Sequence, residues 1–288
     1  MTSITIGHAT DVGKKRNHNE DAYIALLPPN TPGGVEALLA VADGMGGRQA
    51  GEVASNIAVQ IIADRFSVKG ATLVPGSGNF EDVLRSIVEQ ANAEIFSQGT
   101  GETQGMGTTL TVVLIAKDNL YYGHVGDSRA YIFRNGVLTR ITNDHSWVAE
   151  EVRAGRLTEN EAASHRRRNV ITRALGSESS VVVDTGIVRL LPGDCILLSS
   201  DGLHAVINDD DIAKMLKNHN SLQPVTNKLI EAALSNGGPD NVTVILAQFP
   251  VNDSKALTEV ESQTTITAGA ISTVKTKTEH PWWKLFGR

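Results

Sequence analysis

The stretch that decides the fold is VEALLAVADGMGG, residues 35–47. From Val35 to Ala42 it is almost continuously apolar, which is typical of a strand that is buried on both faces of a sheet. It then passes through Asp43 and Gly44 into a glycine-rich segment, whose backbone can adopt turn conformations that other residues avoid. The stretch therefore predicts a buried strand that carries a carboxylate to a tight turn at its end.

The rest of the chain to residue 249 alternates between apolar patterns of period two and of period 3.6. A helix is expected after the glycines, where Val53, Ile57 and Ile61 recur at helical spacing. Asn135-Gly136 predicts a hairpin turn between two strands. Further strands are expected at residues 4–10, 21–27, 109–116, 120–125, 129–134, 137–139, 181–190, 194–200 and 242–249, and further helices at 81–96, 209–216 and 222–234. This α+β pattern fits a layered sandwich of two sheets flanked by helices.

Two segments lack such periodicity. Residues 69–79 are rich in Gly, Ser and Pro and predict a loop. Residues 251–288 hold ten Ser or Thr among 38 residues, which predicts a flexible tail after a folded domain at 1–250. The tail ends in an aromatic and basic segment, Pro281–Phe286, which either docks on a partner protein or a membrane surface, or packs back on its own domain.

Composition narrows the classes of function. The chain has 288 residues, 41% of them apolar, and a formal net charge of −6, which argues against binding to nucleic acid. Its single cysteine, Cys195, lies in an apolar run and reads as a buried strand thiol rather than a nucleophile. There is no apolar run of about 18 residues and no basic N-terminal region followed by an apolar stretch. A cytoplasmic location is therefore expected.

Five aspartates fall at the mouths of predicted strands, mostly beside glycine: Asp21, Asp43, Asp127, Asp201 and Asp240. The backbone position of an aspartate fixes its oxygens well, and Mg²⁺ and Mn²⁺ prefer oxygen ligands. Asp-Gly is also an ordinary turn dipeptide, so each aspartate alone fits a turn residue. Residue chemistry alone thus does not distinguish a metal enzyme with several aspartate ligands from a set of ordinary turns.

Six motifs, ordered along residues 4–249, resemble those of the metal-dependent protein phosphatases of type 2C (PPM) in their bacterial form. Each motif alone is unspecific, whereas six in the family's order are specific. The motifs are Arg16-x-x-Asn19-Glu20-Asp21, Val41-Ala42-Asp43-Gly44-Met45-Gly46-Gly47, Gly107-Thr108-Thr109, Val125-Gly126-Asp127-Ser128-Arg129, Ser200-Asp201-Gly202-Leu203 and Asp240-Asn241-Val242-Thr243.

The resemblance implies a four-layer α-β-β-α sandwich in which helix pairs flank two antiparallel sheets. It also implies a serine/threonine protein phosphatase that hydrolyses phosphoserine and phosphothreonine monoesters with a metal-activated hydroxide at a binuclear Mg²⁺ or Mn²⁺ centre. In this reading Asp43 bridges the two ions, and the carbonyl of Gly44 completes one shell. Asp201 and Asp240 hold one ion, and Asp21 acts on the other largely through water.

The resemblance also implies roles outside this core. Asp127 matches the position of a third, weaker ion in bacterial members. Arg16 would hold the substrate phosphate, so that Arg16 and Asp43 are the expected catalytic residues; without the motif, Arg16 reads as part of a solvated basic run. The expected partners are phosphoprotein substrates and a serine/threonine kinase counterpart, with the enzyme itself a monomer.

One position departs from the family pattern. Eukaryotic members carry a histidine, proposed as general acid, where this chain has Met45, and methionine cannot donate a proton. His145 and His165 are the nearest candidates by segment, although a lone histidine is more often structural. Both lie in the polar segment 144–175, which resembles a flap beside the site in bacterial members. Its Arg166-Arg167-Arg168 run either attracts phosphopeptides or is simply solvated.

Three rival readings remain. A pseudophosphatase would keep the fold without turnover, yet all the expected acids are present. A phosphatase of a sigma-factor partner switch would share the chemistry, but no sensor domain is visible. An interaction protein would act through its tail, with the domain as a scaffold.

Overall fold

The structure is a computed structural model that describes residues 3–46, 50–66, 80–217 and 221–251. These residues belong to one compact unit that ends at Val251. The loop expected at residues 69–79 lies outside the described residues, and so does the tail beyond residue 251. The division into a domain at 1–250 and a tail at 251–288 therefore stays a prediction.

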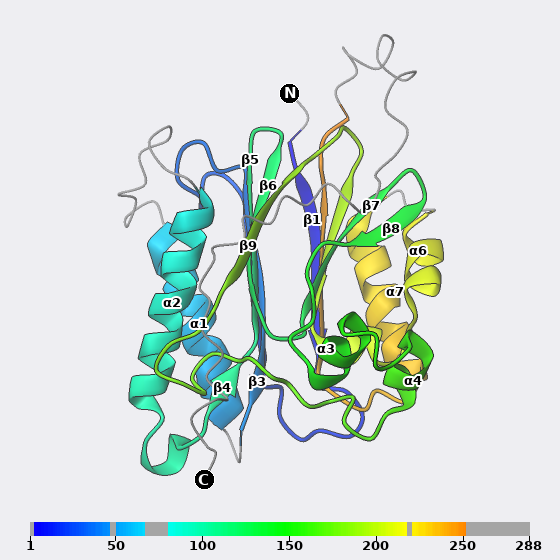
Figure 1. Cartoon of the computed structure of the whole chain (residues 1–288). Helices are drawn as coiled ribbons and strands as arrows, with labels where there is room; N and C mark the ends of the chain where they lie inside the picture. Colours follow the sequence, from blue (N-terminus) through cyan, green and yellow to red (C-terminus); the bar gives the residue numbers. More distant parts are fainter. Residues whose placement is uncertain (1–2, 47–49, 67–79, 218–220, 252–288) are drawn as a thin grey trace. The chain divides into compact units, whose positions relative to one another are not determined.

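Two antiparallel sheets form the centre of the fold (Figure 1). Sheet A has the strand order β1-β11-β10-β7-β8, and sheet B has the order β2-β3-β5-β6-β9, with the short β4 paired to β3. The strands of sheet A are β1 Thr5–Asp11, β7 Arg129–Arg134, β8 Val137–Arg140, β10 Cys195–Ser199 and β11 Val242–Gln248. Those of sheet B are β2 Asp21–Leu26, β3 Ala37–Met45, β4 Gly107–Thr108, β5 Leu110–Ala116, β6 Asn119–Val125 and β9 Asp184–Arg189.

Helix pairs cover the two outer faces of the sandwich (Figure 1). One pair, α1 (Ala50–Phe66) and α2 (Phe80–Gln98), packs on sheet B, and the other, α6 (Asp209–Leu216) and α7 (Leu222–Ser235), packs on sheet A. The predicted four-layer α-β-β-α sandwich is thereby confirmed. Two shorter pieces are α5 (Asp201–His204) and the 3₁₀ turn η1 (Gly101–Thr103). Among the described residues, no helix combines the length and apolar composition needed to cross a membrane.

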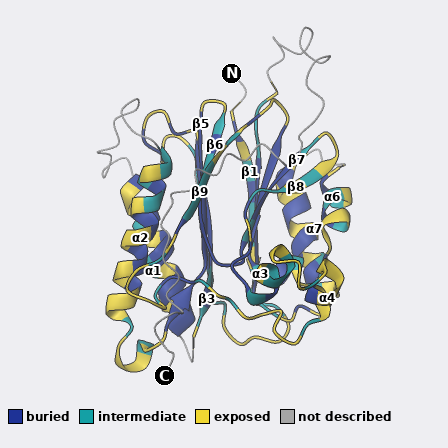
Figure 2. Cartoon of the chain, in the orientation of Figure 1, coloured by how far each residue is buried: buried dark blue, intermediate teal, exposed yellow. Residues whose placement is uncertain are grey.

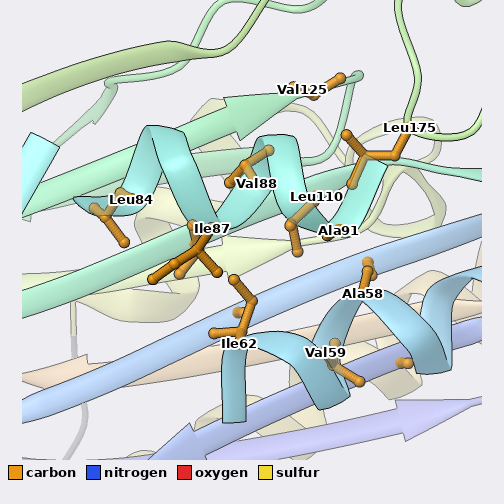
Figure 3. Packing of buried hydrophobic residues seen from close by; sticks show 14 of the residues in the cluster. Ala58, Val59, Ile62, Leu84, Ile87, Val88, Ala91, Leu110, Val125 and Leu175 are labelled. Carbon is orange, nitrogen blue, oxygen red and sulfur yellow. The ribbon is translucent and has the colours of Figure 1, made fainter. Parts of the chain in front are cut away.

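The core has three apolar layers, one between the sheets and one beneath each helix pair. Figure 2 shows the burial concentrated in the strands, with exposed residues along the outer faces of the helices. Under α1 and α2, side chains such as Ile62, Leu84 and Ile87 interlock above sheet B (Figure 3). Burying a side chain of this size contributes roughly 1.5–3 kcal/mol, so the helices are held to the sheets mainly by apolar packing.

The strand predicted from residues 35–47 is the central β3, and its side chains alternate between two layers. Leu38 and Ala40 face the layer beneath α1 and α2, whereas Leu39 and Val41 face the layer between the sheets. All four are fully buried, which confirms burial on both faces. Cys195 is likewise buried, at the start of β10, as expected.

The polar segment 144–175 contains two short helices that the sequence analysis did not predict. They are α3 (Trp147–Arg153) and α4 (Glu159–Ser164). Ser146 caps α3 by accepting from the Ala149 N–H, and Thr158 forms a capping box with Glu161 at α4. These caps were readable from the sequence. The helices are too short to show a clear apolar period. We call the segment 144–175 the flap.

Candidate metal centre

The five predicted aspartates reach one end of the sandwich from different strands. Asp21 opens β2 and lies opposite Asp43 of β3 in the antiparallel register. Asp201 follows β10, and Asp240 precedes β11, which pairs with β10 so that these two ends are neighbours. Asp127 lies in the turn from β6 to β7. Both sheets therefore contribute carboxylates to the same end.

Asp21 lies where the two sheets meet. Its Oδ2 accepts hydrogen bonds from Ser200 Oγ at 2.7 Å and from Thr243 Oγ1 at 2.7 Å. Asp21 belongs to sheet B, whereas Ser200 directly follows β10 of sheet A and Thr243 belongs to β11 of that sheet. These two bonds therefore connect the sheets at the cluster.

The carboxylates are close enough to perturb one another. Burial first, and then repulsion from neighbouring carboxylates, raises the pKa of Asp21 to about 7, that of Asp127 to about 8 and that of Asp201 to about 6. Burial also raises the pKa of Asp43 well above its usual range, and all four other aspartates add to this by repulsion. Among the described residues only Asp240 of these five acids has an ion pair, with Arg16, and such a crowd of acids is the environment that a cation relieves.

The donor set fits divalent cations. Oδ1 of Asp21, of Asp127 and of Asp201 is buried without a hydrogen-bond partner in the described part of the chain. Such atoms are costly unless something else binds them. Within residues 3–46, 50–66, 80–217 and 221–251, no three His, Cys, Asp or Glu side chains are arranged to hold a metal ion by themselves. Because Mg²⁺ usually takes one or two carboxylates and keeps several waters, water and backbone carbonyls would complete each shell.

A set of hydroxyl groups holds the backbone of Asp43. Thr108 Oγ1 donates to the Asp43 carbonyl at 2.9 Å, and the Asp43 N–H donates to Thr109 Oγ1 at 2.9 Å. Thr109 Oγ1 in turn hydrogen-bonds Ser128 Oγ at 2.8 Å, beside Asp127. The sequence motifs contain Thr108, Thr109 and Ser128, but no role was expected for them. The local signal was a hydroxyl residue next to an aspartate, as in Asp127-Ser128 and Ser200-Asp201.

Gly44 is required by the close approach of two other segments. A Cβ at this position would overlap the backbone carbonyl oxygens of Gly51 and Glu20. The Gly44 N–H donates to that Glu20 carbonyl at 3.1 Å. The absence of a side chain thus lets the end of β3, the start of α1 and the segment before β2 come together at the cluster.

Arg16 reaches the cluster through Asp240. Its Nη2 donates to Asp240 Oδ2 at 2.8 Å, and its side chain remains 49% exposed. Asn241 holds the approach to this segment by donating from Nδ2 to the His18 carbonyl at 2.9 Å and accepting from the Glu20 N–H at 2.8 Å. The structure therefore places Arg16 beside a predicted metal ligand, with half of its surface open to solvent.

Among the described residues, the side-chain hydrogen bonds of both flap histidines go to groups outside the five carboxylates. Nδ1 of His145 accepts from the Gly126 N–H at 3.0 Å, so the ring proton is on Nε2, which lies 3.1 Å from Asp184 Oδ2. His165 stacks on Trp147 at 4.8 Å between ring centroids, and its Nδ1 accepts from a flap backbone N–H at 3.1 Å. Both rings are engaged in holding the flap.

Two antiparallel sheets between helix pairs are an architecture shared with bacterial serine/threonine phosphatases of known structure. The S. agalactiae serine/threonine phosphatase superposes with a TM-score of 0.78 at 36% identity, covering 86% of this chain and all of that one. The catalytic domain of PstP, solved with two manganese ions, has a TM-score of 0.73 at 38% identity, covering 85% and 97%. The serine/threonine phosphatase Stp of Listeria monocytogenes is 38% identical over 242 residues, which is 83% of this chain and 93% of the relative.

The protein phosphatase 2C family model matches residues 8–242. The chain belongs to this family, whose members depend on divalent metal ions, and it is a phosphoprotein phosphatase.

Proposed function

We propose that the aspartate cluster is a binuclear Mg²⁺ or Mn²⁺ centre at which the chain hydrolyses phosphoserine and phosphothreonine esters. Asp43 would bridge the two ions, and the Gly44 carbonyl would complete one shell. Asp201 and Asp240 would hold one ion, and Asp21 would act on the other, chiefly through water. The two manganese ions bound to PstP support this number of core ions.

The unpartnered oxygens of Asp21, Asp127 and Asp201 are the observation that carries this proposal. Buried carboxylates are held ionised by a metal, by an arginine or by several N–H donors. Nothing in the described chain fills that place at these three atoms. Asp127, on the side of the cluster that faces the flap, would hold a third and weaker ion.

Bound divalent ions would supply a hydroxide nucleophile near neutral pH by lowering the pKa of water. The chain itself binds and orients the ester. Arg16 would present its forked guanidinium to the phosphoryl oxygens and neutralise their charge. Because the His145 proton faces Asp184 and His165 is stacked on the flap, the leaving oxygen would take its proton from water.

The test is hydrolysis of p-nitrophenyl phosphate and a phosphothreonine peptide with Mn²⁺, with and without EDTA. Asp201→Ala and Asp43→Asn should each lose nearly all turnover, and calorimetric Mn²⁺ titration should show weaker binding by the same variants. Asp118→Asn is a matched control, because Asp118 is 52% exposed in the β5–β6 turn, at the opposite end of these strands from the cluster. Full activity in EDTA, or in both cluster variants, would refute the metal centre.

The protein's partners are phosphoprotein substrates in the general sense of its family. A serine/threonine kinase counterpart, a monomeric state and a cytoplasmic location remain proposals that rest on the sequence.

A further inference from the structure

A cavity of about 270 Å³ lies between the flap helices and the metal end of the sandwich. Asp127 and Asp201 form part of its wall, while α3, α4 and the segments around them form the rest. The cavity therefore has a carboxylate end, which belongs to the proposed metal centre, and a flap end that the proposed chemistry does not use.

The flap end is rich in guanidinium groups that lack a carboxylate of their own. Arg129 pairs with Asp144, with its Nη2 2.7 Å from Oδ2, and also donates to the Tyr131 hydroxyl at 3.1 Å. Arg140 reaches only the same carboxylate, at 3.3 Å. Arg153 donates to a backbone carbonyl, that of Asp144, at 3.1 Å. Arg168 also lines this wall. One carboxylate thus serves two arginines and leaves the others without an acid.

The acids that face the cavity do not cancel this charge. Glu159, at the start of α4, is the remaining carboxylate beyond Asp144 and the two cluster aspartates. Once divalent cations neutralise Asp127 and Asp201, the lining of the cavity carries net positive charge. His204 also lines this cavity, and its buried Nδ1 has no hydrogen-bond partner among the described residues. The net positive charge calls for an anion, and Nδ1 of His204 would donate to it in the tautomer that carries the proton on this nitrogen.

We infer that this cavity is a second anion site, which takes a phosphate group beside the one being hydrolysed. Arg140 and Arg153 would pair with its oxygens, because guanidinium groups form charge-assisted hydrogen bonds to phosphate. Arg153 has no ion pair among the described residues, and Arg140 shares its one carboxylate, Asp144, with Arg129. The inference rests on the proposed function, since the neighbouring site must hold the ester. The phosphate comes either from a second phosphorylated residue of the same substrate or from the free anion.

The experiment compares peptides that share one phosphothreonine and differ by a second phosphoserine placed two to six residues away on either side. With the Mn²⁺-loaded enzyme, kcat/KM for the best doubly phosphorylated peptide should exceed that of the single one by about tenfold, mostly through KM, since two partly exposed ion pairs reach that size. Arg153→Gln and Arg140→Gln should each reduce this ratio, and Arg153→Lys should restore part of it.

Arg156→Gln is the matched control. Arg156 lies three residues from Arg153, pairs with Glu151 on the exposed surface and does not line the cavity, so its loss removes one positive charge without touching the site. This variant should keep the wild-type ratio. If Arg156→Gln also lowers the ratio of kcat/KM between the doubly and singly phosphorylated peptides, the preference comes from long-range charge and the second site is overturned.

Inhibition by inorganic phosphate, measured with the singly phosphorylated peptide as substrate, decides the source of the anion. If the free anion occupies the cavity, Arg153→Gln weakens phosphate inhibition while no peptide spacing shows a preference. If the substrate supplies it, the spacing preference appears and phosphate inhibition is unchanged. If every peptide is hydrolysed but neither the spacing preference nor the change in phosphate inhibition appears, the second site is overturned and the phosphatase activity stands. If no peptide is hydrolysed, the proposed function itself is refuted.

Discussion

His145 connects the flap to the turn that carries Asp127, and its replacement tests that connection. Its ring is 4% exposed; Nδ1 accepts from the Gly126 N–H at 3.0 Å, and Nε2–H faces Asp184 Oδ2 at 3.1 Å. The backbone N–H of His145 also donates to the Gly126 carbonyl at 2.7 Å. Gly126 has a φ of 112°, a conformation that favours glycine, and both of its bonds to His145 hold the turn at this residue.

His145→Ala would leave the buried Gly126 N–H without a partner, at a cost of about 1–3 kcal/mol. It would also remove the bond to Asp184, which is worth less because Asp184 is 38% exposed and retains its ion pair with Arg173 at 2.8 Å. Together we expect a loss of about 3 kcal/mol in the free energy of unfolding. Because supporting hydrogen bonds typically change metal affinity by about 10–100-fold, Mn²⁺ binding at Asp127 should weaken by about tenfold.

Two conservative variants separate the contacts. His145→Asn places an amide oxygen near the position of Nδ1 and can still accept from Gly126, whereas His145→Gln reaches towards Asp184. Urea unfolding measures stability, and calorimetric Mn²⁺ titration measures the weakest site. His145→Asn should recover more of the Mn²⁺ affinity than His145→Gln. Wild-type Mn²⁺ affinity in all three variants, despite lower stability, would refute the argument.

Three further predictions follow from single residues. Burial lowers the pKa of His124 from 6.5 to about 4. Between these pH values the unfolded chain therefore binds a proton that the folded protein does not bind. About 3 kcal/mol of the free energy of unfolding should be lost as the pH falls from 6.5 to 4. The His124→Gln variant should lack this part of the slope in urea unfolding. Gly44→Ala should unfold at a much lower temperature by calorimetry, because its Cβ meets the backbone of Gly51 and Glu20; an unchanged melting temperature would contradict that overlap. Arg16→Ala should raise KM for a phosphothreonine peptide by about tenfold with a smaller effect on kcat, and an unchanged KM would reject its role in holding phosphate.

Much of the secondary structure was accessible from local patterns. The helices expected at 209–216 and 222–234 match α6 (Asp209–Leu216) and α7 (Leu222–Ser235) to within a residue, because their apolar period and length are clear. The flap helices were missed since six or seven residues show little period. Their caps, Ser146 and Thr158, were the only local signal.

The sequence by itself determined the buried strand that carries Asp43, the α+β class and the family, because periodicity and short ordered motifs are written within a few neighbouring residues. It could not separate a metal ligand from a turn residue for any single aspartate. Tertiary structure decided which side chains meet at the cluster, since the partners of Asp21 lie 179 and 222 positions away, at Ser200 and Thr243. It also decided where the proton of His145 lies and which arginines share Asp144. Burial and charge depend on what strand register and packing bring together, and no local pattern encodes them.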